Sequence, residues 1–229
     1  MSDPATIALA ALAGYLVGSV SFARLIGRVV APARPLGSDT LSFGADGTVV
    51  EVQGVSATSV SVRAGRRWGF LVALLDIGKA AAVTLVVRLL DPTGDAYLVA
   101  AAFAVVGHVW PAWHGFRGGF GVSPIIGGLL VVDPLAIPVT IAAGLLLGVL
   151  VADRLVTYDG WTLLLAPWFL VVRGDPAAAL YAAAITAIYW WAMRDEVRDH
   201  VRRLRTGPRG WRDRFADIRA GYTGDPRVG

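Results

Sequence analysis

Long apolar stretches separated by short polar turns run through most of the chain. A membrane-crossing α-helix needs about 20 residues. The stretches that approach this length are residues 7–30, 68–90, 97–113, 135–152 and 176–193. Residues 122–132 and 161–172 are about half as long, which is typical of re-entrant or tilted helices buried in protein. The pattern therefore predicts an all-α polytopic membrane protein with about seven membrane segments, two of them short.

Two polar regions interrupt this pattern. In the first long loop, β-branched runs on either side of Asp46-Gly47 predict a β-hairpin, within an insertion at about residues 39–54. Residues 55–63 also alternate with the period of a strand. After residue 193, two apolar stripes predict amphipathic helices, lying either at the membrane surface or on the face of their own bundle. The chain thus divides into a membrane domain, residues 1–193, and a basic tail, residues 194–229.

Composition agrees with a membrane protein and narrows the chemistry. Of the 229 residues, 55% are hydrophobic and only 17% are charged, which is too apolar for an ordinary soluble domain. The absence of cysteine excludes disulfides, thiolate metal sites and a cysteine nucleophile. The sequence shows no serine–histidine–aspartate triad, zinc-protease motif, Walker loop or metal-ligand cluster, so we expect neither a metal nor a cofactor.

Basic residues orient the membrane segments. Arginines flank the first long loop, whereas the turn at residues 91–95 has no basic residue. With seven crossings, the positive-inside rule places the N-terminus outside and the C-terminus in the cytoplasm. The net charge of +4 arises entirely after residue 193, where ten arginines accompany six acidic residues. Beside membrane segments, such a tail indicates a cytoplasmic location and anionic lipid rather than nucleic acid.

A glycine-rich basic turn between two apolar segments is the most informative local feature. Residues 116–121 read Phe-Arg-Gly-Gly-Phe-Gly, shortly after Gly107-His108. Arg117 offers a bidentate guanidinium, and the glycines would leave free backbone N–H groups for an anion. The same glycines could equally close a tight turn without chemical purpose. On the first interpretation, the turn predicts an anion site and a phosphate-bearing substrate handled beside lipid.

Other ionisable residues could take part in this chemistry. Asp76 and Lys79 lie one helical turn apart inside an apolar segment, as either a self-neutralising ion pair or a ligand site. His108 is either a functional group, as a general base or as a hydrogen-bond donor to phosphate, or a hydrogen-bonded structural group. Arg63 belongs to the arginines that by default mark the cytoplasmic side of a membrane protein.

Several motifs occur in an order that resembles one known family. In chain order they are Gly14–Val20, Leu25–Arg28, Gly37-Ser38, Ala57–Val60, Leu74–Ala80, Gly107-His108 with Pro111, and Phe116–Gly119. Together they resemble the bacterial membrane glycerol-3-phosphate acyltransferases that use acyl phosphate as donor, over about residues 13–138. The seven-segment topology inferred from charge is also what this family implies.

The resemblance implies acyl transfer from acyl phosphate to the 1-hydroxyl of glycerol-3-phosphate, giving lysophosphatidate and phosphate for phospholipid biosynthesis. It implies an enzyme of the bacterial plasma membrane without a cofactor, in contact with membrane lipid; a monomer is favoured, although the oligomeric state stays open. His108 would be catalytic. The substrate-binding residues would be Ser38, Thr58, Ser59, Arg63, Lys79, Arg117, Gly118, Gly119 and Gly121.

Departures from the family pattern leave alternatives open. The family has a lysine at the position of Phe120 and an asparagine at that of Ser59, and its final His-x-x-Asn motif falls on Val197 and His200. A catalytically inactive homologue that binds phospholipid or a phosphorylated ligand is the alternative. A small transporter is a weaker reading, because the candidate groups cluster at one face rather than across the midplane.

Overall fold

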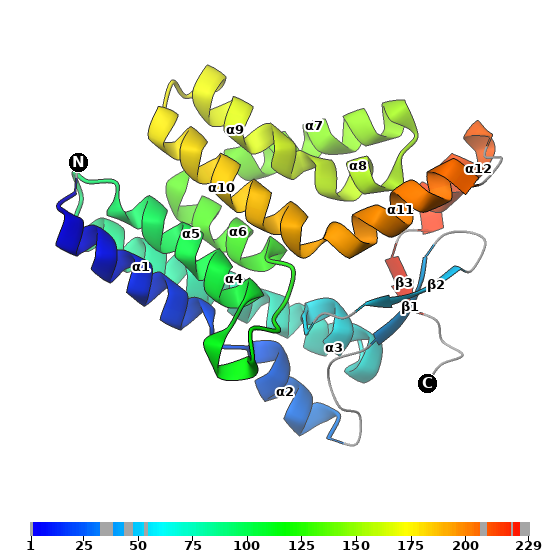
Figure 1. Cartoon of the computed structure of the whole chain (residues 1–229), viewed down its shortest axis with the longest axis horizontal. Coiled ribbons are helices and arrows are strands. Elements are labelled where there is room, and N and C mark those ends of the chain that lie inside the picture. Colours follow the sequence, from blue (N-terminus) through cyan, green and yellow to red (C-terminus); the bar gives the residue numbers. More distant parts are fainter. Residues whose placement is uncertain are drawn as a thin grey trace.

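The computed structural model describes residues 2–32, 39–43, 48–52, 55–206, 210–220 and 222–224. Its helices are α1 (Pro4–Gly18), α2 (Phe22–Val30), α3 (Ala57–Ala64), α4 (Arg66–Leu90), α5 (Ala96–Val109), α6 (Val122–Val132), α7 (Ala136–Val151), α8 (Arg154–Asp159), α9 (Leu165–Pro167), α10 (Pro176–Ala192), α11 (Arg194–Thr206) and α12 (Trp211–Ala220). Short helical turns are η1 (Ala112–His114), η2 (Gly160–Leu164) and η3 (Trp168–Val172), and the strands are β1 (Asp39–Phe43), β2 (Thr48–Val52) and β3 (Tyr222–Gly224) (Figure 1).

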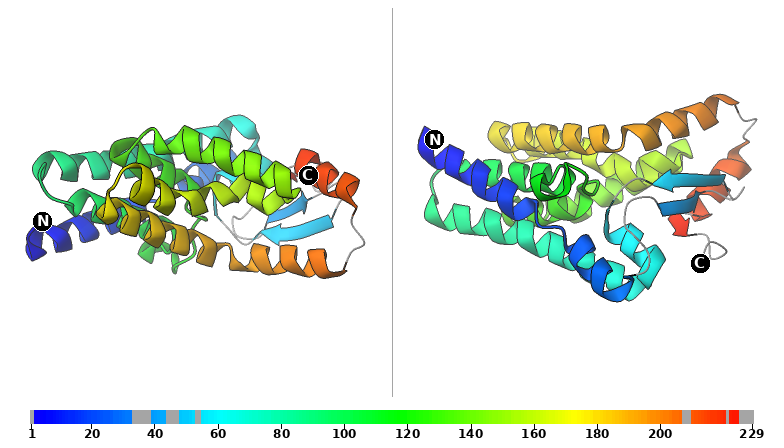
Figure 2. Two further views of the ribbon diagram at one scale, coloured as in Figure 1. Left: turned by 90° about the horizontal axis from the view of Figure 1, so that it is seen from above. Right: turned by 60° about the horizontal axis from the view of Figure 1, so that its bottom comes forward.

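The prediction of a helical membrane protein is confirmed by an elongated bundle of apolar helices (Figures 1 and 2). Among the described residues, four stretches are long and apolar enough to cross a membrane: Pro4–Val30, Arg66–Leu90, Ala96–His114 and Arg154–Val172. α10 and α11 make a fifth if counted together, although they meet at an angle of 67°. α6 and α7 are apolar but shorter.

Three segments differ from the sequence-based expectation. The first is interrupted at residues 19–21, because Ser21 caps α2 by accepting a hydrogen bond from the Arg24 backbone N–H at 3.4 Å. Residues 161–172, predicted to be a short piece, continue a longer stretch that begins at Arg154. Residues 135–152, predicted to be full-length, form a helix of only 16 residues.

The region between α2 and α4 contains strands and a helix. β1 pairs antiparallel with β2, with Asp39 opposite Val52, and β3 joins the other edge of β1. Residues 44–47, predicted to form the hairpin turn, lie outside the described part of the chain. The prediction of a strand at residues 55–63 is wrong. Residues 57–63 are instead part of α3, because Ser56 and Ser59 form a reciprocal capping box that starts a helix.

The tail forms helices that rest on the bundle. Trp211 and Phe215 of α12 pack against each other, with ring centroids 6.1 Å apart. The Tyr158 hydroxyl donates a hydrogen bond to the Ile218 carbonyl at 2.8 Å, which attaches α12 to α8. The sequence was compatible with a tail at the membrane surface or on the face of its own bundle. In the structure, α12 contacts its own bundle.

Small residues allow α1 and α5 to approach closely. A Cβ at Gly14 would overlap the carbonyl of Ala100, and one at Gly18 would overlap that of Ala104. On α5, Gly107 packs in the same way against the carbonyl of Tyr15. Lipid supplies no hydrophobic force between membrane helices, so close backbone packing holds them together. This contact places the end of α5 beside the break between α1 and α2.

Asp133, between α6 and α7, joins these helices to the segment before α10. Its carboxylate accepts two hydrogen bonds from the Arg173 guanidinium, at 2.6 and 2.7 Å, and one from the Trp168 indole at 2.8 Å. The hydrogen bonds from Arg173 hold the pKa of Asp133 below its ordinary value. This bidentate pair ties together segments that are 40 residues apart in the sequence.

Replacing Gly14 with alanine should destabilise the protein, because the new methyl group would overlap the Ala100 backbone. Overpacking typically costs about 1–3 kcal/mol, or a fall of roughly 2–12 °C in melting temperature. Gly78→Ala is the matched control, because nothing lies within 4 Å of a Cβ at that position on α4. Thermal unfolding in detergent should show a loss only for Gly14→Ala. Equal melting temperatures would contradict the packing argument.

Asp133→Asn should lower the melting temperature near neutral pH, because it removes the carboxylate that Arg173 binds. The folded-state pKa is lowered, so the stabilisation is present above the unfolded-state value of about 3.9. It is lost as the pH falls through the folded-state pKa. Melting curves recorded across the acid range should therefore converge for the two proteins at the lowest pH. A difference that stays constant with pH would rule out this ionisation as its source.

Candidate active site

Lys79 lies at the centre of a buried cluster of ionisable side chains. Its Nζ is 2.7 Å from Asp76 Oδ1 on the same helix, and the two side chains are 5% and 2% exposed. His108, at the end of α5, brings Nδ1 to 3.2 Å from Lys79 Nζ and 3.6 Å from Asp76 Oδ1. The structure thus joins two of the predicted site residues, Lys79 and His108, through contacts that need α4 and α5 to pack side by side.

The break between α1 and α2 completes the surroundings of Lys79. The ammonium group donates a hydrogen bond to the Val20 carbonyl at 2.5 Å. It also lies 5.7 Å from the centroid of the Phe22 ring, within the range of a cation–π contact. Neither partner was predicted from the sequence. The available signal was the serine at position 21, which favours a new helix start and so a carbonyl left outside the helix.

The glycine turn folds back onto the end of α5. The N–H of Gly118 donates to the Val109 carbonyl at 3.1 Å, and that of Gly119 to the His108 carbonyl at 3.2 Å. The expectation that these two N–H groups are free is wrong, because the last carbonyls of a helix need partners and take them. Gly121, with φ at 104°, precedes α6. The N–H groups that open α6 have no intrahelical partner and are the ones suited to an anion.

His108 contacts the glycine turn through its ring as well as its carbonyl. A Cβ at Gly119 would collide with His108 Nε2, so only glycine permits this approach. The imidazole therefore lies between Lys79 and the turn, with Nδ1 toward the first and Nε2 toward the second. The Val55 N–H donates to the Gly118 carbonyl at 3.1 Å, which brings the start of α3 beside the same turn.

Arg117 lies on the exposed side of the turn. Its side chain is solvent-accessible, and it forms no ion pair with the part of the chain that the structure describes. Its backbone carbonyl accepts a hydrogen bond from Arg24 Nη2 at 2.8 Å, which attaches the turn to α2. The guanidinium of Arg117 is therefore available for a ligand, while its backbone is fixed.

The site residues predicted around Gly37-Ser38 and Ala57–Val60 have different surroundings. Thr58 is exposed at the start of α3, and Arg63 is half-buried near its end. Ser59 is buried, and its hydroxyl donates to the Ser56 carbonyl at 2.8 Å within the capping box. Ser38 lies outside the described residues. Within the described ranges, histidine and acidic side chains form no group of three suited to a metal ion.

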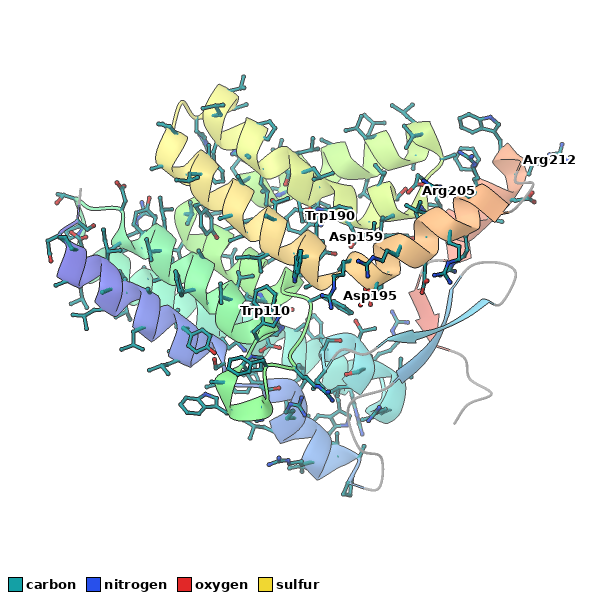
Figure 3. All side chains as sticks on the ribbon, in the orientation of Figure 1. Trp110, Asp159, Trp190, Asp195, Arg205 and Arg212 are labelled. Carbon is teal, nitrogen blue, oxygen red and sulfur yellow. The ribbon has the colours of Figure 1, made fainter. Side chains whose placement is uncertain are left out.

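A second polar cluster joins η2 and its neighbours to α10. The Tyr189 hydroxyl donates to Asp159, and the Trp190 indole donates to the Thr162 hydroxyl at 3.0 Å. Figure 3 shows Asp159 and Trp190 in this region, whereas Trp110 lies beside the glycine turn. The cluster contains none of the predicted site residues.

The two residues at the position of the family's final motif, Val197 and His200, have different surroundings. His200 Nε2 lies 2.9 Å from Asp153 Oδ2, whereas Val197 packs against the main hydrophobic core. Burial raises the pKa of Asp153, but hydrogen bonds from His200 and from the Val156 N–H outweigh burial and leave the pKa below its ordinary value. These contacts attach α11 to the beginning of α8.

Comparison with known proteins identifies relatives of this chain. The family model for glycerol-3-phosphate acyltransferase matches residues 8–203. A glycerol-3-phosphate acyltransferase of Agrobacterium fabrum is 34% identical over 202 residues, covering 85% of this chain and 88% of the relative. One of Halalkalibacterium halodurans is 32% identical, covering 83% and 89%.

Two crystal structures of PlsY (YgiH), an integral membrane glycerol 3-phosphate acyltransferase, share the fold. They are the lysophosphatidic acid form and the glycerol 3-phosphate form, each with a TM-score of 0.68 and 22% identity. The first comparison covers 91% of this chain and 98% of that protein, and the second covers 89% and 94%.

The buried charges should depend on each other for stability. Asp76→Asn leaves the Lys79 ammonium buried without its carboxylate, and breaking a buried pair costs about 3–5 kcal/mol. The double variant Asp76→Asn with Lys79→Met removes both charges and should be clearly more stable than Asp76→Asn alone. Unfolding in detergent compares the stability of the two variants with that of the unmodified chain. A double variant as unstable as the single one would show that the pair is not coupled.

Proposed function

This chain belongs to the glycerol-3-phosphate acyltransferase family, and we propose that it transfers an acyl group from acyl phosphate to the 1-hydroxyl of glycerol-3-phosphate. The products are lysophosphatidate and inorganic phosphate. In this proposal the protein lies in the bacterial plasma membrane, with its N-terminus outside, its C-terminus in the cytoplasm and the site at the cytoplasmic end. The observation that carries the proposal is the contact of the buried Lys79–His108 pair with Gly119 of the basic turn.

The reaction balances without a protein nucleophile. The 1-hydroxyl oxygen forms a bond to the acyl carbon, and the bond from that carbon to the phosphate oxygen breaks. The departing phosphate accepts the hydroxyl proton. The protein then has to orient two phosphate-bearing molecules and stabilise the negative charge of the transition state. The exposed guanidinium of Arg117 and the N–H groups that open α6 suit this task.

We assign His108 a positioning role rather than that of a general base. Its Nδ1 already lies 3.2 Å from Lys79 Nζ, and its Nε2 side faces Gly119. The ring therefore has little access to a substrate hydroxyl but is well placed to hold the turn. Similarly, Ser59 supports α3 through its capping box, which leaves Thr58 and Arg63 as the candidates on that helix for contact with substrate.

A catalytically inactive homologue remains the second candidate, and one observation favours it. Phe120 and Val197 both pack against the main hydrophobic core. The resemblance to the family leads one to expect a lysine and a histidine there. Each missing charge-assisted contact to phosphate would weaken binding by roughly 1.5–3 kcal/mol. The active enzyme therefore needs other groups, Arg117 above all, to hold phosphate.

Turnover by the purified full-length protein separates these candidates. Detergent-solubilised protein given acyl phosphate and glycerol-3-phosphate should release phosphate and lysophosphatidate in equal amounts. Arg117→Ala should lower kcat/KM roughly 10- to 150-fold, the equivalent of losing one charge-assisted hydrogen-bonded contact. Its melting temperature should not change, because the side chain is exposed.

Arg66→Ala is the matched control, since it removes an exposed arginine from the start of α4 rather than from the turn. It should keep the activity of the unmodified protein. Full activity in Arg117→Ala would remove Arg117 from the site. No turnover by folded protein that still binds acyl phosphate would favour the inactive homologue.

A further inference from the structure

α2 carries two arginines, and no acidic side chain of the described residues pairs with them. Arg24 and Arg28 are four residues apart and so lie on one helical face. Within the described part of the chain neither forms an ion pair, and the buried Nε of Arg24 has no hydrogen-bond partner. Clustered like charges repel each other, so a bound anion would stabilise this arrangement.

Exposed apolar side chains lie beside these arginines. On α2, Leu25 and Val29 form a second row, and Val29 is 80% exposed. In the turn after α5, Trp113 and Phe116 are each 62% exposed. Arg24 donates a hydrogen bond to the carbonyl of Arg117, the residue after Phe116, so α2 and the turn are in contact. The surface formed by α2 and residues 112–117 thus combines cationic and apolar groups.

Phe116 is held outward in an unfavourable backbone conformation. Its φ is 59°, in the left-handed region that bulky residues rarely adopt. A hydrogen bond from its N–H to the Pro111 carbonyl at 3.0 Å fixes this conformation. The exposed ring gains little packing within the chain in return. Backbone strain of this kind is concentrated at functional sites, which points to contact with something outside the protein.

The length of the first segment places this surface near the lipid headgroups. Pro4–Val30 contains 27 residues, whereas about 20 are enough to cross the hydrocarbon core. If α1 begins at one surface, Arg24 and the residues after it reach the headgroup layer at the other. Tryptophan and arginine are common at that depth, where an apolar body and a polar end are both satisfied.

We propose that α2 and residues 112–117 form a binding site for an anionic phospholipid. Arg24 and Arg28 bind the headgroup phosphate, while Leu25, Val29 and the exposed rings of the turn contact the adjoining acyl region. This lipid is neither the substrate nor the product of the proposed reaction. The site adjoins the candidate active site, because Arg24 holds the backbone of Arg117. Its occupation would reduce the repulsion acting on that turn.

A fluorescent label can test this surface, because the chain contains no cysteine. A label on Leu25→Cys reports on lipids at α2, and one on Phe70→Cys reports on a matched position that follows Arg66 and Arg67. Both proteins are placed in vesicles of phosphatidylcholine containing a minority of brominated phosphatidylglycerol, or the same fraction of brominated phosphatidylcholine. The brominated anionic lipid should quench the label at position 25 more strongly than the zwitterionic one. Position 70 should show little difference.

Arginine variants then identify the groups responsible. Arg24→Gln with Arg28→Gln should remove the preference for the anionic lipid. Each substitution should weaken binding of that lipid about fivefold. Arg66→Gln with Arg67→Gln makes the same charge change elsewhere and should leave it intact. Equal loss in both double variants would overturn the site in favour of general surface charge. The proposal would also be overturned if the labelled Leu25→Cys protein with all its arginines showed no preference for the anionic lipid.

The source of the phosphate is tested in the same vesicles. Millimolar inorganic phosphate or glycerol-3-phosphate should not displace the brominated lipid, because neither supplies an apolar part. Displacement by either would show a site for soluble phosphate and overturn the lipid proposal. The measurement requires no turnover, so its outcome is independent of the proposed acyl transfer.

Discussion

An ammonium group buried among membrane helices is costly unless several partners surround it. Lys79 finds these partners in three places: Asp76 on its own helix, His108 on α5, and Val20 with Phe22 at the break between α1 and α2. The candidate active site depends on this single requirement. If any of these helices moved away, a charge would lose its partner inside a medium that cannot solvate it.

The glycines make this arrangement possible by allowing backbones to approach. Gly14 and Gly18 bring α1 against α5, which sets the carbonyl of Val20 near the Lys79 ammonium. Gly119 lets the turn after α5 contact the other side of His108. Small residues thus act at two levels, first in helix packing and then in the site itself. The chemistry of the turn is connected to the helix contacts through the His108 ring.

Polar contacts that hold the bundle are kept apart from those that form the site. Asp133 and Arg173 join segments beyond α6, and Asp153 with His200 attaches the tail helix α11 to α8. These pairs give fixed connections to the second half of the chain. Arg117, by contrast, has an anchored backbone and an unpaired side chain among the described residues. That combination is what a substrate-binding group at a membrane surface requires.

The sequence by itself determined the membrane class, the approximate positions of most apolar helices and the placement of Asp76 and Lys79 on one helical face, because hydropathy and helical spacing are local properties. It also indicated the family, through short motifs. The capping box that makes residues 57–64 helical was readable but competed with a strand-like alternation. Only the tertiary structure decided that the Gly118 and Gly119 N–H groups bind carbonyls of α5, and that Val20 and Phe22 complete the Lys79 site. Those partners come from distant segments, and packing rather than local propensity brings them together.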